Sequence, residues 1–235
     1  MNKLPINGDL VGVSIDPISH SWTNRDPMLY ALGVGGRPPE DLDFIYEGRG
    51  PKVVPTFAVI PGLRAMGSAM QRIDINLAAL LHGEQSVTTH RPLPAAAEVT
   101  VEGSIAAVWD KGKAAVIEFE GIGYDTEGPL FAVRASLFVL GGGGWGGERG
   151  PSGSAASNAA PARDPDVVVE RETRPEQAAI YRLSGDMNPM HIDPDFATKA
   201  GIPDPFNHGL CTFGTIGPSV VPAWSCPISM QQRSM

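Results

Sequence analysis

Residues 141–165 separate two stretches of different character. They read GGGGWGGERGPSGSAASNAAPARDP, a run of glycine, serine, alanine and proline with little apolar side chain to bury. Such a composition is typical of a flexible linker rather than of a packed domain. The sequence therefore predicts two units, residues 1–140 and residues 166–235, joined by a loosely ordered segment.

The overall composition is that of a globular protein, since 42% of the 235 residues are hydrophobic and 19% are charged. A formal net charge of −8 argues against nucleic-acid binding, which usually requires a clustered basic face. Cys211 and Cys226 give no disulfide framework, the N-terminus lacks the apolar core of a signal peptide, and no apolar run is long enough for a membrane span. We therefore expect a cytoplasmic protein with neither nucleic acid nor a membrane among its partners.

The first unit has strong β character near its end. Three runs rich in Val, Ile and Phe are separated by short turn sequences and cover residues 99–110, 113–125 and 130–140. A helical apolar stripe precedes them at residues 53–70, where Pro61 and Gly62 are expected to interrupt the helix. An antiparallel meander covered by a helix is an α+β arrangement.

The second unit predicts helices instead. Thr173 to Glu176 has the pattern of a capping box, and the helix that follows should end at Ser184 and Gly185. A short helix is predicted over residues 194–200, stopped by Gly201. Another helix begins near Gly209 and carries an apolar stripe of Leu210, Phe213, Ile216 and Val220, and we expect Cys211 on its apolar face to be a core residue rather than a nucleophile.

The two units share a weak internal repeat. Each has a helix with a Tyr-x-Leu pair, at Tyr30 in the first unit and Tyr181 in the second, and each has an apolar helix further on, near Phe57 and Phe213. Directly after its Tyr-x-Leu pair, the second unit has polar and titratable side chains where the first has glycines and an arginine. We expect one chemical half and one half that serves as scaffold or binding surface.

The polar stretch is YRLSGDMNPMHIDPDFA, residues 181–197. In one interpretation, Asp186 and Asn188 only form Asx turns in a proline-containing loop, and His191 is a bystander. In a second interpretation the stretch holds a metal ion, but His208 is the only further candidate imidazole, which makes the ligand set thin. In a third, these groups are catalytic.

The stretch, together with HGLCTFG at residues 208–214, resembles the signature of the MaoC-like (R)-specific enoyl-CoA hydratases, or type 2 hydratases. The resemblance extends to SWTNRDPMLYALGVG, VVPTFAVIPG and LLHGEQSV in the first unit, so it covers residues 20–220. It implies a double hot-dog fold, in which each half is a long helix wrapped by an antiparallel sheet. The amino-terminal half is then degenerate and serves as scaffold or binds the acyl chain.

The resemblance also implies an activity, the hydration of 2-trans-enoyl-CoA to (3R)-3-hydroxyacyl-CoA or the reverse dehydration. Asp186 and His191 would activate the water, Asn188 would help to fix it, and the backbone N–H of Gly209 would bind the thioester oxygen. The partner is an acyl-CoA thioester, with a possible homodimer, and no cofactor or metal is implied. Residues implied to contact substrate are Tyr181, Gly185, Pro189, His208, Leu210, His82 and Gly83.

The sequence departs from the family after about Pro222. From Phe57 to Leu140 the first unit continues for 83 residues, whereas only 22 residues follow Phe213. We therefore expect an incomplete second hot dog whose long helix is poorly covered. Two alternatives stay open: a non-catalytic remnant that binds or oligomerises, and a hot-dog thioesterase or acyl dehydratase of fatty-acid or polyketide synthesis.

Overall fold

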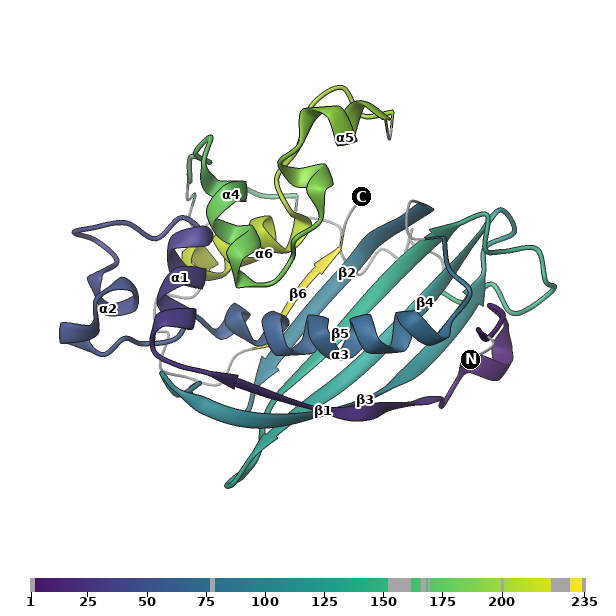
Figure 1. Ribbon diagram of the computed structural model, residues 1–235, viewed down its shortest axis with the longest axis horizontal. Helices are drawn as coiled ribbons and strands as arrows, with labels where there is room; N and C mark the ends of the chain where they lie inside the picture. The colour runs from purple at the N-terminus through teal and green to yellow at the C-terminus, as the bar shows by residue number, and fades with distance from the viewer. Residues whose placement is uncertain are drawn as a thin grey trace.

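A six-stranded antiparallel sheet wraps around one long helix, α3 (Val59–Arg72), in the computed structural model (Figure 1). The structure describes residues 3–76, 79–151, 162–165, 168, 170–199, 201–220 and 229–233. The strand order is β1-β3-β4-β5-β2-β6. The strands are β1 (Ser14–Trp22), β2 (Leu80–Thr89), β3 (Ala97–Asp110), β4 (Ala114–Asp125), β5 (Gly128–Leu140) and β6 (Ser229–Arg233).

Several of the shorter helices gather at one end of α3. Figure 1 shows the green helix of residues 177–181 and the yellow helix of residues 209–220 there, next to α1 of the first half. Among the described residues, no helix is long and apolar enough to cross a membrane. The α-helices are α1 (Arg25–Gly33), α2 (Leu42–Ile45), α4 (Gln177–Tyr181), α5 (Pro194–Lys199) and α6 (Gly209–Val220), and the 3-10 turns are η1 (Gly8–Leu10), η2 (Glu47–Arg49), η3 (Pro55–Ala58), η6 (Arg182–Ser184) and η7 (Pro189–His191).

The predicted meander is confirmed as β3, β4 and β5, and three further strands, β1, β2 and β6, lie outside it. β1 contains Pro17 at a register shift between Ile15 and Ile18, which is where a strand tolerates a missing N–H group. β2 carries a polar sequence and a second register shift at Gly83. Both irregularities break the alternation by which a strand is recognised in a sequence.

The expected interruption of the first long helix is wrong. η3 leads directly into α3, so Pro61 lies in the first turn, where an N–H group has no intrahelical acceptor to lose. Gly62 packs closely on the sheet, because a Cβ atom there would lie 2.8 Å from Cγ2 of Val133. Proline and glycine here therefore serve the start and the packing of one continuous helix.

The predicted capping box is also wrong. α4 begins at Gln177, and the backbone N–H of Arg174 donates to Gln177 Oε1 at 3.2 Å. Gln177 is 1% exposed, and its amide nitrogen also lies 3.2 Å from the Thr215 hydroxyl of α6. Burial of the glutamine against α6 thus decides where the helix begins. The predicted helices at residues 194–200 and from Gly209 are confirmed as α5 and α6, except that Ala200 lies outside the described residues.

The first ten residues of the predicted linker are folded against the sheet, contrary to expectation. The carboxylate of Asp110 accepts backbone N–H groups from Gly112, Gly144 and Gly146 at 2.7 to 2.8 Å and from Gly147 at 3.3 Å. These hydrogen bonds hold the pKa of Asp110 at about 2. Trp145 packs on the apolar cluster beneath α3, so this segment does bury a large side chain. Residues 152–161 of the predicted linker lie outside the described residues.

The long helix of the second half is better covered than the sequence predicts. Leu210 and Phe213 are 5% and 2% exposed and belong to one core cluster with Val34, Phe57 and other residues of the first half. Ile216 is 45% exposed, as expected, and the side chain of Val220 lies outside the description. The helix is therefore buried largely by the other half of the chain.

The tail after α6 also differs from expectation. β6 pairs with β2 from Glu84–Arg233 to Thr88–Ser229 and extends the sheet of the first half by one strand. Among the described residues of the second half, β6 is the only strand. The sheet therefore contains strands from both predicted units and crosses the predicted boundary between them.

Candidate active site

The catalytic candidates lie on a tight loop between α4 and α5. Gly185 has a φ of 138°, a left-handed value that favours glycine, and it ends the turn after α4. Asp186 Oδ1 accepts the backbone N–H of Asn188 at 3.2 Å, and Asn188 Oδ1 accepts that of Met190 at 3.1 Å. Pro189 then starts η7, which ends at His191. Asp186 and Asn188 thus form Asx turns, and these turns shape the loop that carries Asp186 and His191.

A backbone carbonyl fixes the orientation of His191. Its Nδ1 lies 2.9 Å from the carbonyl oxygen of Phe206. Because a carbonyl oxygen only accepts, Nδ1 carries the proton and Nε2 keeps a free lone pair. His191 is half-buried. Nε2 is therefore the basic nitrogen that its ring offers, because Nδ1 is occupied by the hydrogen bond to Phe206.

His208 lies beneath the loop. Its Nε2 is 3.1 Å from the main-chain oxygen of Asp186, and its ring centroid is 3.9 Å from that of His191. The side chain is only 1% exposed. Burial, followed by the neighbouring His191, lowers the pKa of His208 to about 4, so the ring is neutral at physiological pH.

The structure brings the predicted dyad together. Asp186, His191 and His208 each place one ligand-type atom within 4.8 Å of the others. They are the group among the described residues that could hold a metal ion. One carboxylate and two imidazoles supply three ligands, whereas proton transfer needs only the Asp186 carboxylate and the His191 imidazole.

Gly209 follows His208 directly and is the first residue of α6. N–H groups in the first turn of a helix have no intrahelical acceptor, and the helix dipole favours negative charge there. A Cβ atom at Gly209 would meet nothing within 4 Å, so space is open around this backbone. A side chain at position 209 would project into this open space.

The other predicted contact residues fall into two groups. Tyr181 and Leu210 are 0% and 5% exposed and, like His208, lie under the site rather than on its surface. His82 and Gly83 lie on β2, where burial lowers the pKa of the His82 imidazole and contacts with Gln85, Glu84 and Asp186 act in the opposite direction. His82 of the first half is thus within electrostatic range of Asp186 of the second.

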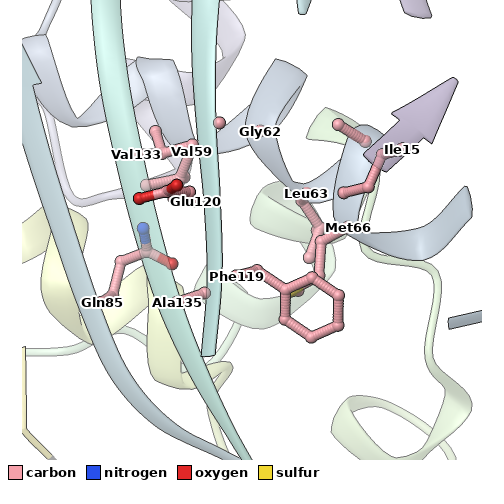
Figure 2. Close-up of a pocket in the computed structure, with 12 residues that line it drawn as sticks. Ile15, Val59, Gly62, Leu63, Met66, Gln85, Phe119, Glu120, Val133 and Ala135 are labelled. Carbon is pink, nitrogen blue, oxygen red and sulfur yellow. The ribbon is translucent and has the colours of Figure 1, made fainter. Parts of the chain in front are cut away.

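A small, partly open pocket lies between α3 and the sheet (Figure 2). Its lining is mostly apolar and includes Leu63, Met66 and Phe119. Figure 2 shows Gln85 of β2 beside Ala135 of β5 at the pocket. Gln85 also contacts His82 of the same strand.

The sequence did not reveal two features of this site. The carbonyl of Phe206, which orients His191, is a backbone group and leaves no signature in a sequence.

The second feature is the register shift at Gly83. It aligns His82 with Leu137 and Gln85 with Ala135, so the side chains of His82 and Gln85 both point toward the helix-covered face. Residues three apart in a regular strand would lie on opposite faces. Glycine in the polar run LLHGEQSV is the signal by which this shift could have been predicted.

A sheet wrapped around a long helix, and a second long helix whose N-terminus meets an Asp–His pair, define a double hot-dog protein of the hydratase type. The family description "MFE-2 hydratase 2 N-terminal domain" matches residues 20–141, and "MaoC like domain" matches residues 156–229. The chain belongs to the MaoC-like hydratase 2 family, as its resemblance in sequence implied.

Named relatives agree with this assignment. The chain is 44% identical over 226 residues to "3-hydroxyacyl-thioester dehydratase Y" of Mycobacterium tuberculosis, which covers 93% of this chain and 77% of the relative. It is 42% identical over 211 residues to "Peroxisomal multifunctional enzyme type 2" of Mus musculus, covering 87% of this chain. The match spans only 29% of the mouse enzyme.

Solved structures share the fold. A MaoC-like dehydratase from Phytophthora capsici matches with a TM-score of 0.79 and 28% identity, over 98% of this chain and 88% of the other. The full-length peroxisomal multifunctional enzyme type 2 from Drosophila melanogaster matches with a TM-score of 0.74 and 34% identity, over 88% of this chain and 37% of that enzyme.

Proposed function

We propose that this chain adds water to a 2-trans-enoyl-CoA to give a (3R)-3-hydroxyacyl-CoA, and catalyses the reverse dehydration. The observation that carries the proposal is the convergence of Asp186 and His191 within 4.8 Å, next to the N-terminus of α6. The names of relatives, among them "Enoyl-CoA hydratase 2, peroxisomal" of Arabidopsis thaliana, support it.

The geometry suggests how the groups divide the work. The Asp186 carboxylate and the His191 Nε2 lone pair hold one water molecule. As its oxygen bonds to C3, one water proton is taken up by the pair and a proton is delivered to C2. The π electrons of the double bond move toward the thioester oxygen, where the N–H group of Gly209 and the helix dipole stabilise the negative charge. Water thus adds completely, with its hydroxyl at C3 and a hydrogen at C2.

The first half offers an apolar pocket for an acyl chain. The pocket under α3 is lined mainly by apolar side chains, and one of its lining residues, Gln85, contacts His82. We propose that this pocket receives the acyl chain, so that the half without the dyad supplies substrate binding. The substrate is then a fatty acyl thioester rather than a polar one.

Three further expectations are proposals. The peroxisomal names of several relatives favour a role in the β-oxidation of fatty acids. A cytoplasmic location and a homodimer remain predictions from the sequence.

Hydration is tested by mixing the purified chain with crotonyl-CoA and with 2-decenoyl-CoA and following the absorbance of the conjugated thioester. We expect the absorbance to fall with both substrates, and D186N to slow the reaction strongly. Absence of turnover in a folded sample would contradict the proposal and favour a binding or oligomerisation role.

A further inference from the structure

We propose that His208 is a positioning residue that holds both members of the dyad and the oxyanion donor in one fixed arrangement. The inference rests on the proposed function, since it concerns the same site. Its basis is geometric: His208 contacts Asp186 and His191 from beneath and adjoins Gly209 in the chain.

The position of the His208 ring is set by α6. The His208 carbonyl accepts the backbone N–H groups of Cys211 at 3.0 Å and Thr212 at 3.1 Å, which makes His208 the residue that precedes the first helical turn. The backbone N–H of His208 donates to Asn207 Oδ1 at 3.0 Å. The backbone that carries the imidazole is therefore anchored to the same helix that carries the N–H group of Gly209.

The ring then contacts the loop at two places. Nε2 donates to the main-chain oxygen of Asp186, because a carbonyl oxygen only accepts, and this bond fixes the backbone from which the catalytic carboxylate projects. The face of the ring lies against His191, which is held on another side by the Phe206 carbonyl. One buried side chain thus fixes the separation of carboxylate, imidazole and helix N-terminus.

The arrangement requires a neutral His208. With Nε2 donating, Nδ1 is an acceptor, and it is buried without a hydrogen-bond partner among the described residues. A proton at Nδ1 would add a buried charge beside His191 and Arg182, opposed only by Asp186. Of the two stacked rings, His191 is therefore the one that takes up the proton from water.

Two pairs of variants separate positioning from mere packing. In H208Q the side-chain amide nitrogen reaches about as far as Nε2 of the histidine, so it can still donate to the main-chain oxygen of Asp186. In H208N the side chain is too short for its amide nitrogen to reach that oxygen. H208L keeps the volume of the side chain and has no donor, and H20L makes the same change in β1, away from the site.

The expected losses are in turnover rather than in binding. Since a displacement of about 1 Å at a reacting centre can cost ~10²-fold in rate, we expect kcat to fall ~10²-fold in H208L and H208N, with KM changed less than about threefold. H208Q should recover most of the loss, and H20L should resemble the wild type.

The imidazole signals of His191 give a measurement that does not depend on turnover. In nitrogen–proton correlation spectra, wild type, H20L and H208Q should show His191 as the Nδ1–H tautomer, and H208N should show shifted or exchange-averaged signals. Equal kcat values and equal His191 spectra in H208N and H208Q would overturn the inference, even if H208L fails to fold. A wild type without hydratase activity would overturn the proposed function instead, and the spectra would still decide the role of His208.

Discussion

The rings of Tyr30 and Tyr181 lie against each other with their centroids 5.8 Å apart. They occupy corresponding places in the predicted repeat, and each is fully buried. Tyr30 also packs edge-on to Phe57 at 5.6 Å, and Tyr181 lies 5.0 Å from His208. The core of the first half is thus connected ring by ring to the catalytic loop of the second.

This interface predicts a contrast between two variants of Tyr181. Its hydroxyl group is buried without a hydrogen-bond partner among the described residues, so Y181F should change the free energy of unfolding by less than about 1 kcal/mol. Y181A leaves a cavity between the halves and should lower the free energy of unfolding by about 3–5 kcal/mol. Urea denaturation measures both, and equal losses would show that the hydroxyl rather than the ring holds the interface.

The dyad predicts a second result. D186N and H191Q should each reduce kcat by ~10²-fold or more, because each removes a proton-transfer partner with little change in size. The double variant should be about as slow as the slower single variant, since the two groups act on one water molecule. D195N alters an exposed carboxylate on the same segment and serves as the control. Near-normal turnover in either folded dyad variant would remove that residue from the mechanism.

The pocket under α3 predicts a dependence on acyl length. Ala135 of β5 lines this pocket, whereas Ala132 of the same strand alternates toward the other face. A135L should lower kcat/KM for 2-decenoyl-CoA by ~10-fold and leave that for crotonyl-CoA within about twofold, because only the longer chain needs the space. A132L is the matched control. If A135L affected both substrates equally, the acyl chain would have to lie elsewhere.

Asp110 predicts a pH effect on stability. Backbone N–H groups lower its pKa from the ordinary 3.8 to about 2 in the folded protein, so its contribution to stability is fully present above the ordinary value and is lost as the pH falls toward 2. D110N should therefore be less stable than wild type at pH 7, and the difference should narrow below about pH 4. D16N, which changes an exposed carboxylate on β1, should show no such trend. A difference that stays constant from pH 7 to pH 3 would contradict this role.

The sequence predicted those features that depend on neighbouring residues. Alternation predicted β3 to β5, and the resemblance of residues 181–197 to a family signature predicted the loop on which Asp186 and His191 come together. The sequence did not predict the features that depend on contacts between residues far apart in the chain. The burial of Leu210 and Phe213 comes from the first half, the start of α4 comes from contacts of Gln177 with α6, and the role of His208 depends on the fold around it. No local pattern encodes these partners.

The order found in the Gly-rich segment has a similar explanation. The backbone N–H groups of three of its glycines donate to the carboxylate of Asp110. This acceptor lies more than thirty positions earlier in the chain. Composition alone indicates flexibility, because it does not include the acceptor. The segment is thus held by hydrogen bonds to one buried acidic residue together with the packing of the partly buried Trp145.

The most direct test of the account follows the oxygen of water into the product. The chain is incubated with 2-decenoyl-CoA in ¹⁸O-labelled water, and the products are separated on a chiral column and analysed by mass spectrometry. We predict the label in the C3 hydroxyl group of the (3R) product, formed much more slowly by D186N and H191Q. Label in a free carboxylate together with released CoA would show a thioesterase, and a (3S) product or equal rates in the dyad variants would contradict the site described here.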